Sequence, residues 1–469
     1  MIAPSLHPDP VRAQAVSRSR FAFGLTQRTL WLLAAGLLLA LPGFFDARLG
    51  YAMLLWDAVI LLAALADGLR LPPPRAITLS RSWANAPALD SETEIELAIE
   101  SIAPQRGGTI LNCTLTDDLP QAFIVTPQPH KLRAYQGIRA SLRYKIEPRE
   151  RGDVTTGKLY LRYASGLGLV ERWAMAPLEQ TVRVYPSLRQ GEDQQIFLAR
   201  GRQIDLQLRQ VRQRGIGRDF ESLREYLEGD DLRDICWTAT ARRGDLITRR
   251  YQTERSQAVW IVLDAGRLLQ AKSGAQSAIG ERHSKLDHAC STAVALAQLA
   301  LYSGDRVGLL VYGQNIQQRV LPGRGSAHLR QIVEALALAK AEPGEADHLR
   351  ATATLNRYQP RRALILWITD LAETAMRPEV IDGAMQLLHR HVLLFVAMAQ
   401  PEVEALADSW PKNVEQMFRA SAAQELTARR ELLLARLREQ GALTLDLDPA
   451  QLTSAVLNQY LRVKERAML

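Results

Sequence analysis

Residues 258–264 read Ala-Val-Trp-Ile-Val-Leu-Asp (AVWIVLD), an unbroken apolar run that ends on a carboxylate. Such a run, rich in β-branched and aromatic residues, is typical of a strand buried on both faces of a sheet. Similar runs follow at 306–312 (RVGLLVY), 363–369 (ALILWIT), 392–398 (VLLFVAM) and 443–447 (LTLDL), and 316–320 is expected to pair with the second run. Helical patterns lie between them at 285–302, 379–390, near 422–440 and at 450–464. Alternating strands and helices predict an α/β domain over residues 256–469.

Carboxylates follow two of these strands directly. Asp264 comes after the run at 258–263, and Asp370 comes after the run at 363–369. In open parallel sheets, ligands bind at the carboxyl ends of adjacent strands. The sequence therefore places the first candidate site at Asp264 and Asp370.

The segment before this domain, residues 189–255, is predicted to hold a basic linker helix and then a dense charged motif. Acidic and basic residues alternate through 215–246, with large apolar residues such as Phe220, Tyr226 and Trp237 among them. A salt-bridged plug packed on the following domain explains this composition, since Arg pairs bidentately with carboxylates and aromatic residues anchor by burial. A contact surface for a partner or a nucleic acid is the alternative. The Gly-x-Gly-x-x-Phe opening does not indicate dinucleotide binding, because it lies outside a βαβ unit.

This motif resembles the domain of unknown function 58 family. The matching pattern comprises Gly215, Gly217 and Phe220; Arg224, Glu225 and Tyr226; Gly229, Asp230, Asp231 and Arg233; Ile235 and Trp237; and Ala241, Arg242, Arg243 and Gly244. The candidate interaction residues within it are Arg218, Phe220, Arg224, Glu225, Tyr226, Gly229, Asp230, Asp231, Arg233, Trp237, Arg242 and Arg243. The layout of the chain after its N-terminal tail is also similar to that family.

The resemblance implies that the α/β domain is a doubly wound, von Willebrand factor A-like domain with a metal-ion-dependent adhesion site. That site needs Asp-x-Ser-x-Ser, a Thr and a second Asp, whose oxygens suit Mg²⁺. Here Gly266 and Leu268 stand where the hydroxyls belong, and Ala346 stands at the expected Thr position. Only Asp264 and Asp370 persist. We expect a metal-free site, with weak Mg²⁺ binding as the alternative and with Arg267 as the candidate built-in cation.

Residues 76–188 are predicted to form a separate all-β domain. Short alternating segments lie at 94–99 (EIELAI), 109–115 (TILNCTL), 138–146 (IRASLRYKI), 156–163 (TGKLYLRY) and 181–185 (TVRVY). Short strands with this period, separated by turn residues, favour an immunoglobulin-like sandwich. Its expected role is that of a spacer or docking surface, since it contains no evident catalytic grouping.

Two apolar runs, 30–45 and 51–69, predict a transmembrane helical hairpin over residues 29–71. A signal peptide fits poorly, because a second apolar run follows at once and no cleavage site stands out. A buried soluble hairpin remains an alternative, because Asp57 and Asp67 lie in the second run. The flanking positive charges favour a bacterial inner-membrane protein whose N-terminal tail (1–28) and soluble domains are cytoplasmic. The Arg residues before the hairpin are Arg12, Arg18, Arg20 and Arg28, those after it are Arg70, Arg75 and Arg81, and the link holds only Arg48.

The composition limits the possible functions. The net charge of +8 is compatible with an acidic partner or an anionic membrane surface. Three cysteines, Cys113, Cys236 and Cys290, are too few and too far apart for a disulfide framework or a zinc knuckle, and we expect reduced thiols.

Three classes of function are compared. No Gly-x-Ser-x-Gly elbow, His-Glu-x-x-His motif or Gly-x-x-x-x-Gly-Lys loop is present, so we predict no catalytic residues and no ATP hydrolysis. The family resemblance implies a MoxR-type AAA+ ATPase as the partner of a membrane-anchored scaffold or adaptor in protein maturation or complex assembly. A hydrolytic enzyme or a nucleic-acid-binding protein at the membrane is the alternative, although the Arg residues of the motif are matched by acidic residues.

Overall fold

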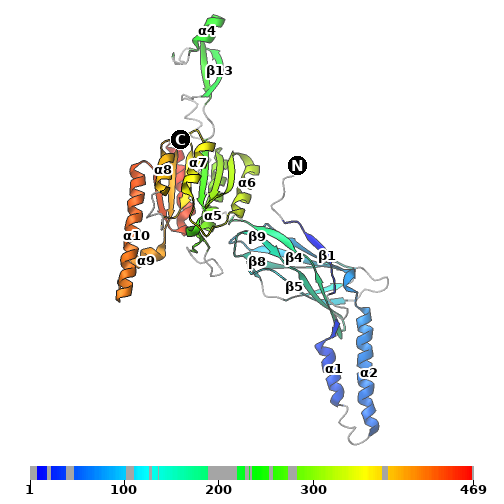
Figure 1. Cartoon of the computed structure of the whole chain (residues 1–469). Helices are drawn as coiled ribbons and strands as arrows, with labels where there is room; N and C mark the ends of the chain where they lie inside the picture. The colour runs from blue at the N-terminus through cyan, green and yellow to red at the C-terminus, as the bar shows by residue number, and fades with distance from the viewer. Residues whose placement is uncertain are drawn as a thin grey trace. The chain divides into compact units, whose positions relative to one another are not determined.

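The computed structural model describes residues 8–17, 23–38, 47–101, 110–125, 129–135, 137–187, 219–227, 232, 235–252, 257–272, 283–371 and 379–466. The chain divides into two compact units, residues 1–185 and 186–469, each with its own hydrophobic core (Figure 1).

The first unit contains two antiparallel five-stranded sheets that pack on a common core. One sheet has the order β1-β3-β4-β8-β6, with bounds Val11–Gln14, Ile77–Trp83, Thr93–Ser101, Ala140–Pro148 and Phe123–Val125. The other has the order β2-β11-β10-β5-β7, with bounds Phe23–Leu25, Val170–Ala176, Leu159–Ser165, Ile110–Asp117 and His130–Tyr135. A two-stranded sheet joins β9 (Gly152–Thr156) to β12 (Gln180–Val184). Burial alternates along β3, which is the period that buries one face of a strand.

The segment predicted as an N-terminal tail contributes to both sheets. β1 pairs with β3, and β2 pairs with β11, so that residues on either side of α1 and α2 complete one folded unit. The predicted boundary between a tail at 1–28 and a sandwich at 76–188 therefore needs correction. Strands of four and three residues, such as Val-Arg-Ala-Gln, are too short and too polar to give a detectable hydrophobic period.

Between these strands lie α1 (Gln27–Leu38) and α2 (Ala47–Arg70). Residues 51–70 of α2 have the length and the mean hydropathy, 1.9, of a membrane-spanning helix. The Trp56 indole donates a hydrogen bond of 2.9 Å to the Leu32 carbonyl oxygen, so the two helices lie together. Gly36 permits this approach, because a Cβ there would lie 2.6 Å from Asp57 Oδ1. Residues 39–46 of the first predicted run lie outside the described residues.

Both helices are fastened to the turn between β10 and β11. Asp67, which is 1% exposed, accepts hydrogen bonds from the backbone amides of Leu169 (3.0 Å) and Val170 (3.3 Å). From α1, the Thr29 hydroxyl donates to the Leu169 carbonyl oxygen at 2.6 Å. The α1 start and the α2 end therefore meet at the same edge of the sandwich. Asp67 belongs to this joint, whereas no hydrogen-bond partner is found for the buried Asp57 Oδ1 among the described residues.

The second unit contains a six-stranded sheet of order β17-β16-β15-β18-β19-β20. The strands are Ile316–Gly323, Arg306–Tyr312, Ala258–Asp264, Leu364–Thr369, Val392–Met398 and Leu443–Leu447, and only the edge strand β17 runs antiparallel. Residues of α7 (His348–Tyr358), α8 (Glu379–Leu388) and α10 (Val414–Glu439) share one core with the sheet. Contacts also join the sheet to α5 (Lys285–Tyr302) and α6 (Gly325–Leu338), and α11 (Leu452–Glu465) packs on α5. The sheet is thus covered on both faces, as its continuous apolar strands predict.

His391, just before β19, is a residue through which acid lowers the stability of this domain. It is 4% exposed, and neither ring nitrogen has a hydrogen-bond partner among the described residues. Burial, with a smaller contribution from the Arg390 cation, lowers the pKa of His391 from 6.5 to about 4. As the pH falls from 6.5 towards 4, the unfolded chain binds a proton that the folded chain does not bind. The folded state therefore loses stability on acidification.

We expect His391→Leu to reduce the loss of unfolding free energy between pH 7 and pH 5 by about 1–2 kcal/mol. Urea unfolding at the two pH values measures the difference. His389→Leu, at an exposed histidine two residues away, is the matched control and should leave the loss unchanged. An unaltered pH dependence in His391→Leu would contradict the assignment.

Candidate functional site

The candidate site lies where the strand order of the α/β sheet reverses. β15 has β16 on one side and β18 on the other, and all three run parallel. Asp264 ends β15 and Asp370 directly follows β18, so the two carboxylates meet at the carboxyl edge where α/β sheets bind ligands. Both are buried, at 5% and 0% exposed. This agrees with their predicted proximity.

Both carboxylate oxygens of Asp264 accept hydrogen bonds from within the protein. Its Oδ1 accepts the Gly266 amide at 2.7 Å, and its Oδ2 accepts the Thr369 hydroxyl at 2.6 Å. Burial raises the pKa of Asp264, and the nearby His348 opposes that rise. A Cβ on Gly266 would lie 3.0 Å from the Ala346 amide nitrogen, so the two residues are neighbours. The family resemblance implies the same arrangement, because it places both residues at the metal site.

Asp370 is neutralised by two cations of the chain itself. The Lys285 ammonium lies 2.5 Å from its Oδ2, and Arg430 Nη1 lies 3.5 Å from its Oδ1. Gln400 Nε2 also donates to Oδ2, at 3.1 Å. Lys285 is the first residue of α5, and the capping box of Ser284 and Asp287 fixes that helix end. The ammonium is therefore held in place by regular structure.

The built-in cation is Lys285, assisted by Arg430, and not Arg267. Arg267 is exposed, and its backbone amide donates to the Gly344 carbonyl oxygen of the neighbouring loop. Sequence analysis favours Arg267 as the built-in cation because it lies three residues after Asp264. Lys285 is distant in sequence and reaches the site only because α5 begins beside the sheet edge.

The donors around the two carboxylates do not fit a magnesium ion. Mg²⁺ requires near-octahedral oxygen ligands at about 2.0–2.1 Å. An ammonium already contacts Asp370, the oxygens of Asp264 accept internal hydrogen bonds, and Gly266 and Ala346 offer no hydroxyl. Among the residues that the structure describes, no cluster of three His, Cys, Asp or Glu side chains could hold a metal. The positive charge of Lys285 lies beside Asp370 at this sheet edge.

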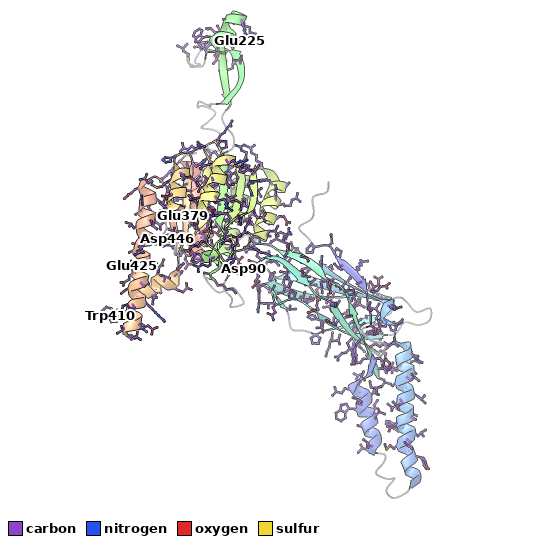
Figure 2. The ribbon with its side chains drawn as sticks, in the orientation of Figure 1. Asp90, Glu225, Glu379, Trp410, Glu425 and Asp446 are labelled. Carbon is purple, nitrogen blue, oxygen red and sulfur yellow. The ribbon has the colours of Figure 1, made fainter. Side chains whose placement is uncertain are left out.

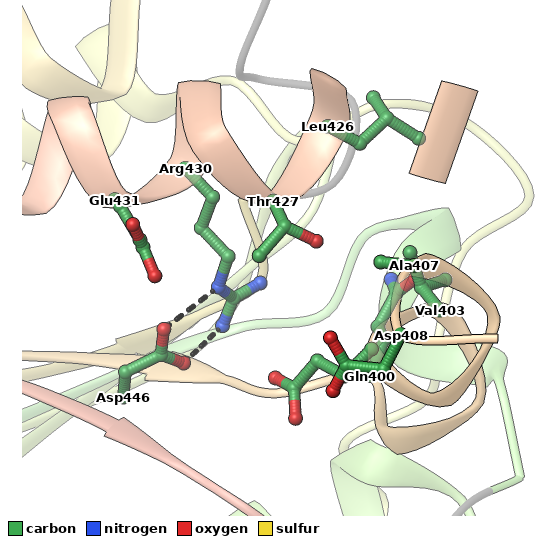
Figure 3. A pocket seen from close by; sticks show the side chains of 10 residues that line it. Gln400, Val403, Ala407, Asp408, Leu426, Thr427, Arg430, Glu431 and Asp446 are labelled. Atoms are coloured by element: carbon green, nitrogen blue, oxygen red, sulfur yellow. Dashed lines mark hydrogen bonds and ion pairs between the residues drawn. The ribbon is translucent and has the colours of Figure 1, made fainter. Parts of the chain in front are cut away.

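A pocket of about 290 Å³ adjoins this site (Figure 3). It lies between α9 (Pro401–Ala407), the middle of α10 and β20. Arg430 forms its inner wall and binds Asp446 through two bonds, Nη2–Oδ1 at 2.6 Å and Nε–Oδ2 at 3.1 Å. Its other charged lining residues, Glu404, Asp408 and Glu431, are acidic. Arg430 thus joins an acidic pocket to the buried Asp370.

The first turn of α10 presents a large apolar surface. Trp410, Val414, Met417 and Phe418 make up this surface, here called the α10 tip, with exposed fractions of 90%, 66%, 47% and 68%. Figure 2 shows Trp410 at the N-terminal end of α10. Val414, Met417 and Phe418 are spaced at i, i+3 and i+4 and so share one face of the helix. A contiguous apolar surface of this kind is typical of an interaction site.

Seven of the twelve predicted motif residues lie on a small β-hairpin. β13 (Asp219–Glu225) pairs with β14 (Ile247–Gln252), and α4 (Trp237–Arg243) lies between them. Gly244 ends α4 with φ of +86°, which explains the Gly of the Ala-Arg-Arg-Gly pattern. Trp237 is 67% exposed, and Arg242 and Arg243 are exposed as well.

The structure therefore brings Arg224, Glu225, Tyr226, Trp237, Arg242 and Arg243 onto one hairpin, with the backbone of Phe220 in β13. Arg218, Gly229, Asp230, Asp231 and Arg233 lie outside the described residues. An exposed tryptophan at the start of α4 fits the contact-surface interpretation of the motif better than a plug anchored by burial.

Sequence reasoning missed Lys285, Thr369, Gln400, Arg430 and Asp446. A weak signal existed for Lys285, since it follows a capping serine on a helix whose inward face is otherwise apolar. Gln400, Arg430 and Asp446 gave no signal, because only the packing of α9, α10 and β20 brings them together.

Comparison with known proteins supports the family resemblance. Residues 222–423 match the family described as "Protein of unknown function DUF58". Uncharacterized proteins of Mycobacterium tuberculosis and Mycobacterium bovis are 27% identical over 198 residues, which cover 41% of this chain and 59% of theirs. The chain therefore matches less than two thirds of the length of these relatives.

Two solved structures have similar segments. The conserved hypothetical protein BatB of Bacteroides thetaiotaomicron is 12% identical with a TM-score of 0.30, over 45% of this chain and 98% of its own. An uncharacterized membrane-spanning protein of Vibrio fischeri is 12% identical with a TM-score of 0.17, over 44% of this chain and 96% of its own.

Proposed function

We propose that this chain is a two-pass protein of the bacterial inner membrane that acts as a non-catalytic adaptor. Its α1–α2 hairpin crosses the bilayer, its immunoglobulin-like sandwich holds the anchor, and its von Willebrand factor A-like domain binds a protein partner in the cytoplasm. The partner is a MoxR-type AAA+ ATPase, which supplies the ATP hydrolysis during protein maturation or complex assembly.

The pairing of β1 with β3 supports the two-pass arrangement. β1 precedes α1, β3 follows α2, and the two strands are hydrogen-bonded from Val11–Arg81 to Gln14–Thr78. A chain that leaves the sandwich, enters the membrane and returns to the same sheet must cross an even number of times. The Arg residues on both sides of the hairpin favour the cytoplasm for that sandwich.

The internal neutralisation of Asp370 supports a non-catalytic α/β domain. Catalysis at such a sheet edge requires groups that can reach a substrate. Asp264, Asp370 and Lys285 are at most 5% exposed. Lys285 binds Asp370, and Asp264 binds the Gly266 amide and the Thr369 hydroxyl, so none of these three side chains is open to a substrate.

The single observation that favours a docking role is Trp410, which is 90% exposed at the N-terminal end of α10. Exposed tryptophans with neighbouring apolar residues are the usual anchors of protein interfaces. The acidic pocket beside α10 adds a site for a basic side chain of the partner. Together they form a surface with an apolar anchor and a charged contact.

The test is a gentle-detergent pull-down of the tagged full-length chain, with and without ATP, read by mass spectrometry. Recovery of an AAA+ ATPase by the wild type is expected. The double variant Trp410→Ala/Phe418→Ala should recover at least about tenfold less, because hot-spot residues cost about 2 kcal/mol or more each. Tyr302→Ala/Leu321→Ala, at two side chains that are each 52% exposed in the same domain, is the matched control. Equal recovery by both variants would reject the α10 tip, and no recovered ATPase would reject the partner.

A further inference from the structure

The outward face of the sheet β2-β11-β10-β5-β7 carries a basic surface with a small-residue floor. The strand register aligns Lys131, Thr114 and Arg162 in one row across β7, β5 and β10. The next row aligns Arg133, Asn112 and Ala164. Neighbouring strands are about 4.8 Å apart, so Lys131 and Arg162 flank Thr114 in the first row, and Arg133 lies beside Asn112 in the second.

These rows line a cavity of about 940 Å³. Its floor is made by small or short residues, including Thr114, Ala164, Gly166 and Gly168, and its rim is basic. Arg28, in the first turn of α1, closes one side. Its Nη1 lies 3.4 Å from the position that a Cβ of Gly168 would occupy, so the guanidinium lies over that glycine. A side chain at Gly168, where φ is +68°, would interfere with this arrangement.

The charge of the cavity is strongly positive. Arg28, Lys131, Arg133 and Arg162 line it, and among the lining residues that the structure describes only Glu171 is acidic. Glu171 Oε2 lies 3.7 Å from Arg162 Nε, so one cation is partly balanced. The described lining residues therefore carry an excess of three positive charges. Hydroxyl, amide and guanidinium groups also line the cavity, and these are the groups that bind phosphate in proteins.

The cavity lies beside the joint between the sandwich and the helices. Ala164 precedes Ser165, and the turn from Ser165 to Val170 holds Asp67 of α2 and Thr29 of α1. If α1 and α2 cross the bilayer as proposed above, this turn lies at the level of the lipid headgroups. Arg28, in the first turn of α1, then lies at the headgroup layer, and the row of Arg133 and the row of Lys131 and Arg162 follow it along the sheet.

We propose that this cavity binds the phosphate of an anionic phospholipid headgroup, with phosphatidylglycerol as the representative. This inference rests on the proposed membrane hairpin, because the hairpin brings the cavity to the headgroup layer. Arg28 and Arg133 bind the phosphate from two sides through their guanidinium groups. Lys131 and Arg162 add positive charge at the rim. The site orients the sandwich on the membrane and gives the anchor a preference for anionic lipid.

Native mass spectrometry of the full-length chain in detergent tests the site, with added phosphatidylglycerol or phosphatidylcholine. Wild type is expected to retain phosphatidylglycerol and to show little retention of phosphatidylcholine. The variant Lys131→Gln/Arg133→Gln/Arg162→Gln should bind phosphatidylglycerol at least about tenfold more weakly. The control Arg143→Gln/Lys145→Gln/Lys158→Gln removes the same charge from exposed side chains of the sandwich outside the cavity and should change binding less than about twofold.

Three results would overturn the inference: equal retention of both lipids, equal weakening by both triple variants, or full displacement of the lipid by millimolar inorganic phosphate. The last result would identify a soluble phosphate compound as the ligand. Alkaline carbonate extraction of the wild type tests the anchor separately. Extraction into the soluble fraction would reject the membrane hairpin whatever the lipid preference, whereas retention with no lipid preference would reject the cavity alone.

Discussion

Replacing Lys285 with methionine is expected to lower the unfolding free energy of the α/β domain by about 3–5 kcal/mol. The ammonium is 1% exposed and lies 2.5 Å from Asp370, which is 0% exposed. Its removal takes away the ammonium at 2.5 Å from a fully buried carboxylate, whose contact with Arg430 is longer, at 3.5 Å. An uncompensated buried charge costs far more than the ion pair itself contributes. Chemical unfolding of the full-length chain, followed by the fluorescence of the buried Trp260 and Trp367, measures the loss.

Two controls separate this electrostatic effect from a packing defect. Lys340→Met, at an exposed lysine of the same domain, should change stability by less than about 0.5 kcal/mol. Lys285→Met/Asp370→Leu removes both charges and should recover at least half of the loss, because buried pairs can be replaced by apolar residues at little cost. A Lys285→Met variant as stable as the wild type would show that the ammonium does not neutralise the site.

Magnesium provides an independent readout of the same arrangement. Millimolar Mg²⁺ should leave the stability of the wild type unchanged, because Lys285 already contacts Asp370. In Lys285→Met, added Mg²⁺ should restore no stability either, because both Asp264 oxygens accept internal hydrogen bonds and because Gly266 and Ala346 offer no hydroxyl. Mg²⁺ stabilisation of the wild type that disappears in Asp264→Ala would contradict the built-in cation.

The α/β strands were predictable because burial on both faces leaves an uninterrupted apolar run. The runs at 306–312, 392–398 and 443–447 coincide with β16, β19 and β20. The helix predicted at 285–302 coincides with α5. Strands of the first unit were harder to detect. β7 (HKLRAY) and β11 (VERWAMA) bury one face and carry charges on the other, and β1 and β2 are too short for any period.

Only those site residues were predictable whose place in the sheet follows from their place in the sequence. Asp264 and Asp370 end neighbouring parallel strands, and the sheet order brings them together. Their partners come from α5, α10 and the segment before α9, whose approach depends on tertiary packing. Arg81 illustrates the same limit in the first unit. It was counted among the positive charges that flank the membrane hairpin, yet its side chain is 0% exposed inside the sandwich.

Arg81 is the centre of a buried polar network that joins the two sheets. It lies in β3, and its Nε donates to Asp117 Oδ2 of β5 at 3.0 Å. Its Nη1 donates to the Thr156 hydroxyl at 2.8 Å and to the Leu178 carbonyl oxygen at 2.9 Å. Tyr144 of β8 donates to the same Asp117 oxygen at 2.5 Å, and burial raises the pKa of Tyr144, so its hydroxyl keeps the proton that it donates.

We expect Arg81→Met to lower the unfolding free energy of the sandwich by about 3–5 kcal/mol, because Asp117 would stay buried and lose the Arg81 guanidinium. Arg183→Met is the matched control, since its pair with Asp153 has the same bidentate form but side chains that are 33% and 36% exposed. That control should lose no more than about 1 kcal/mol, because water solvates both charges. Urea unfolding of the full-length variants in detergent gives both values. Equal losses in the two variants would mean that burial adds nothing to the Arg81–Asp117 pair. A large loss confined to Arg81→Met would show that this network holds the two sheets together.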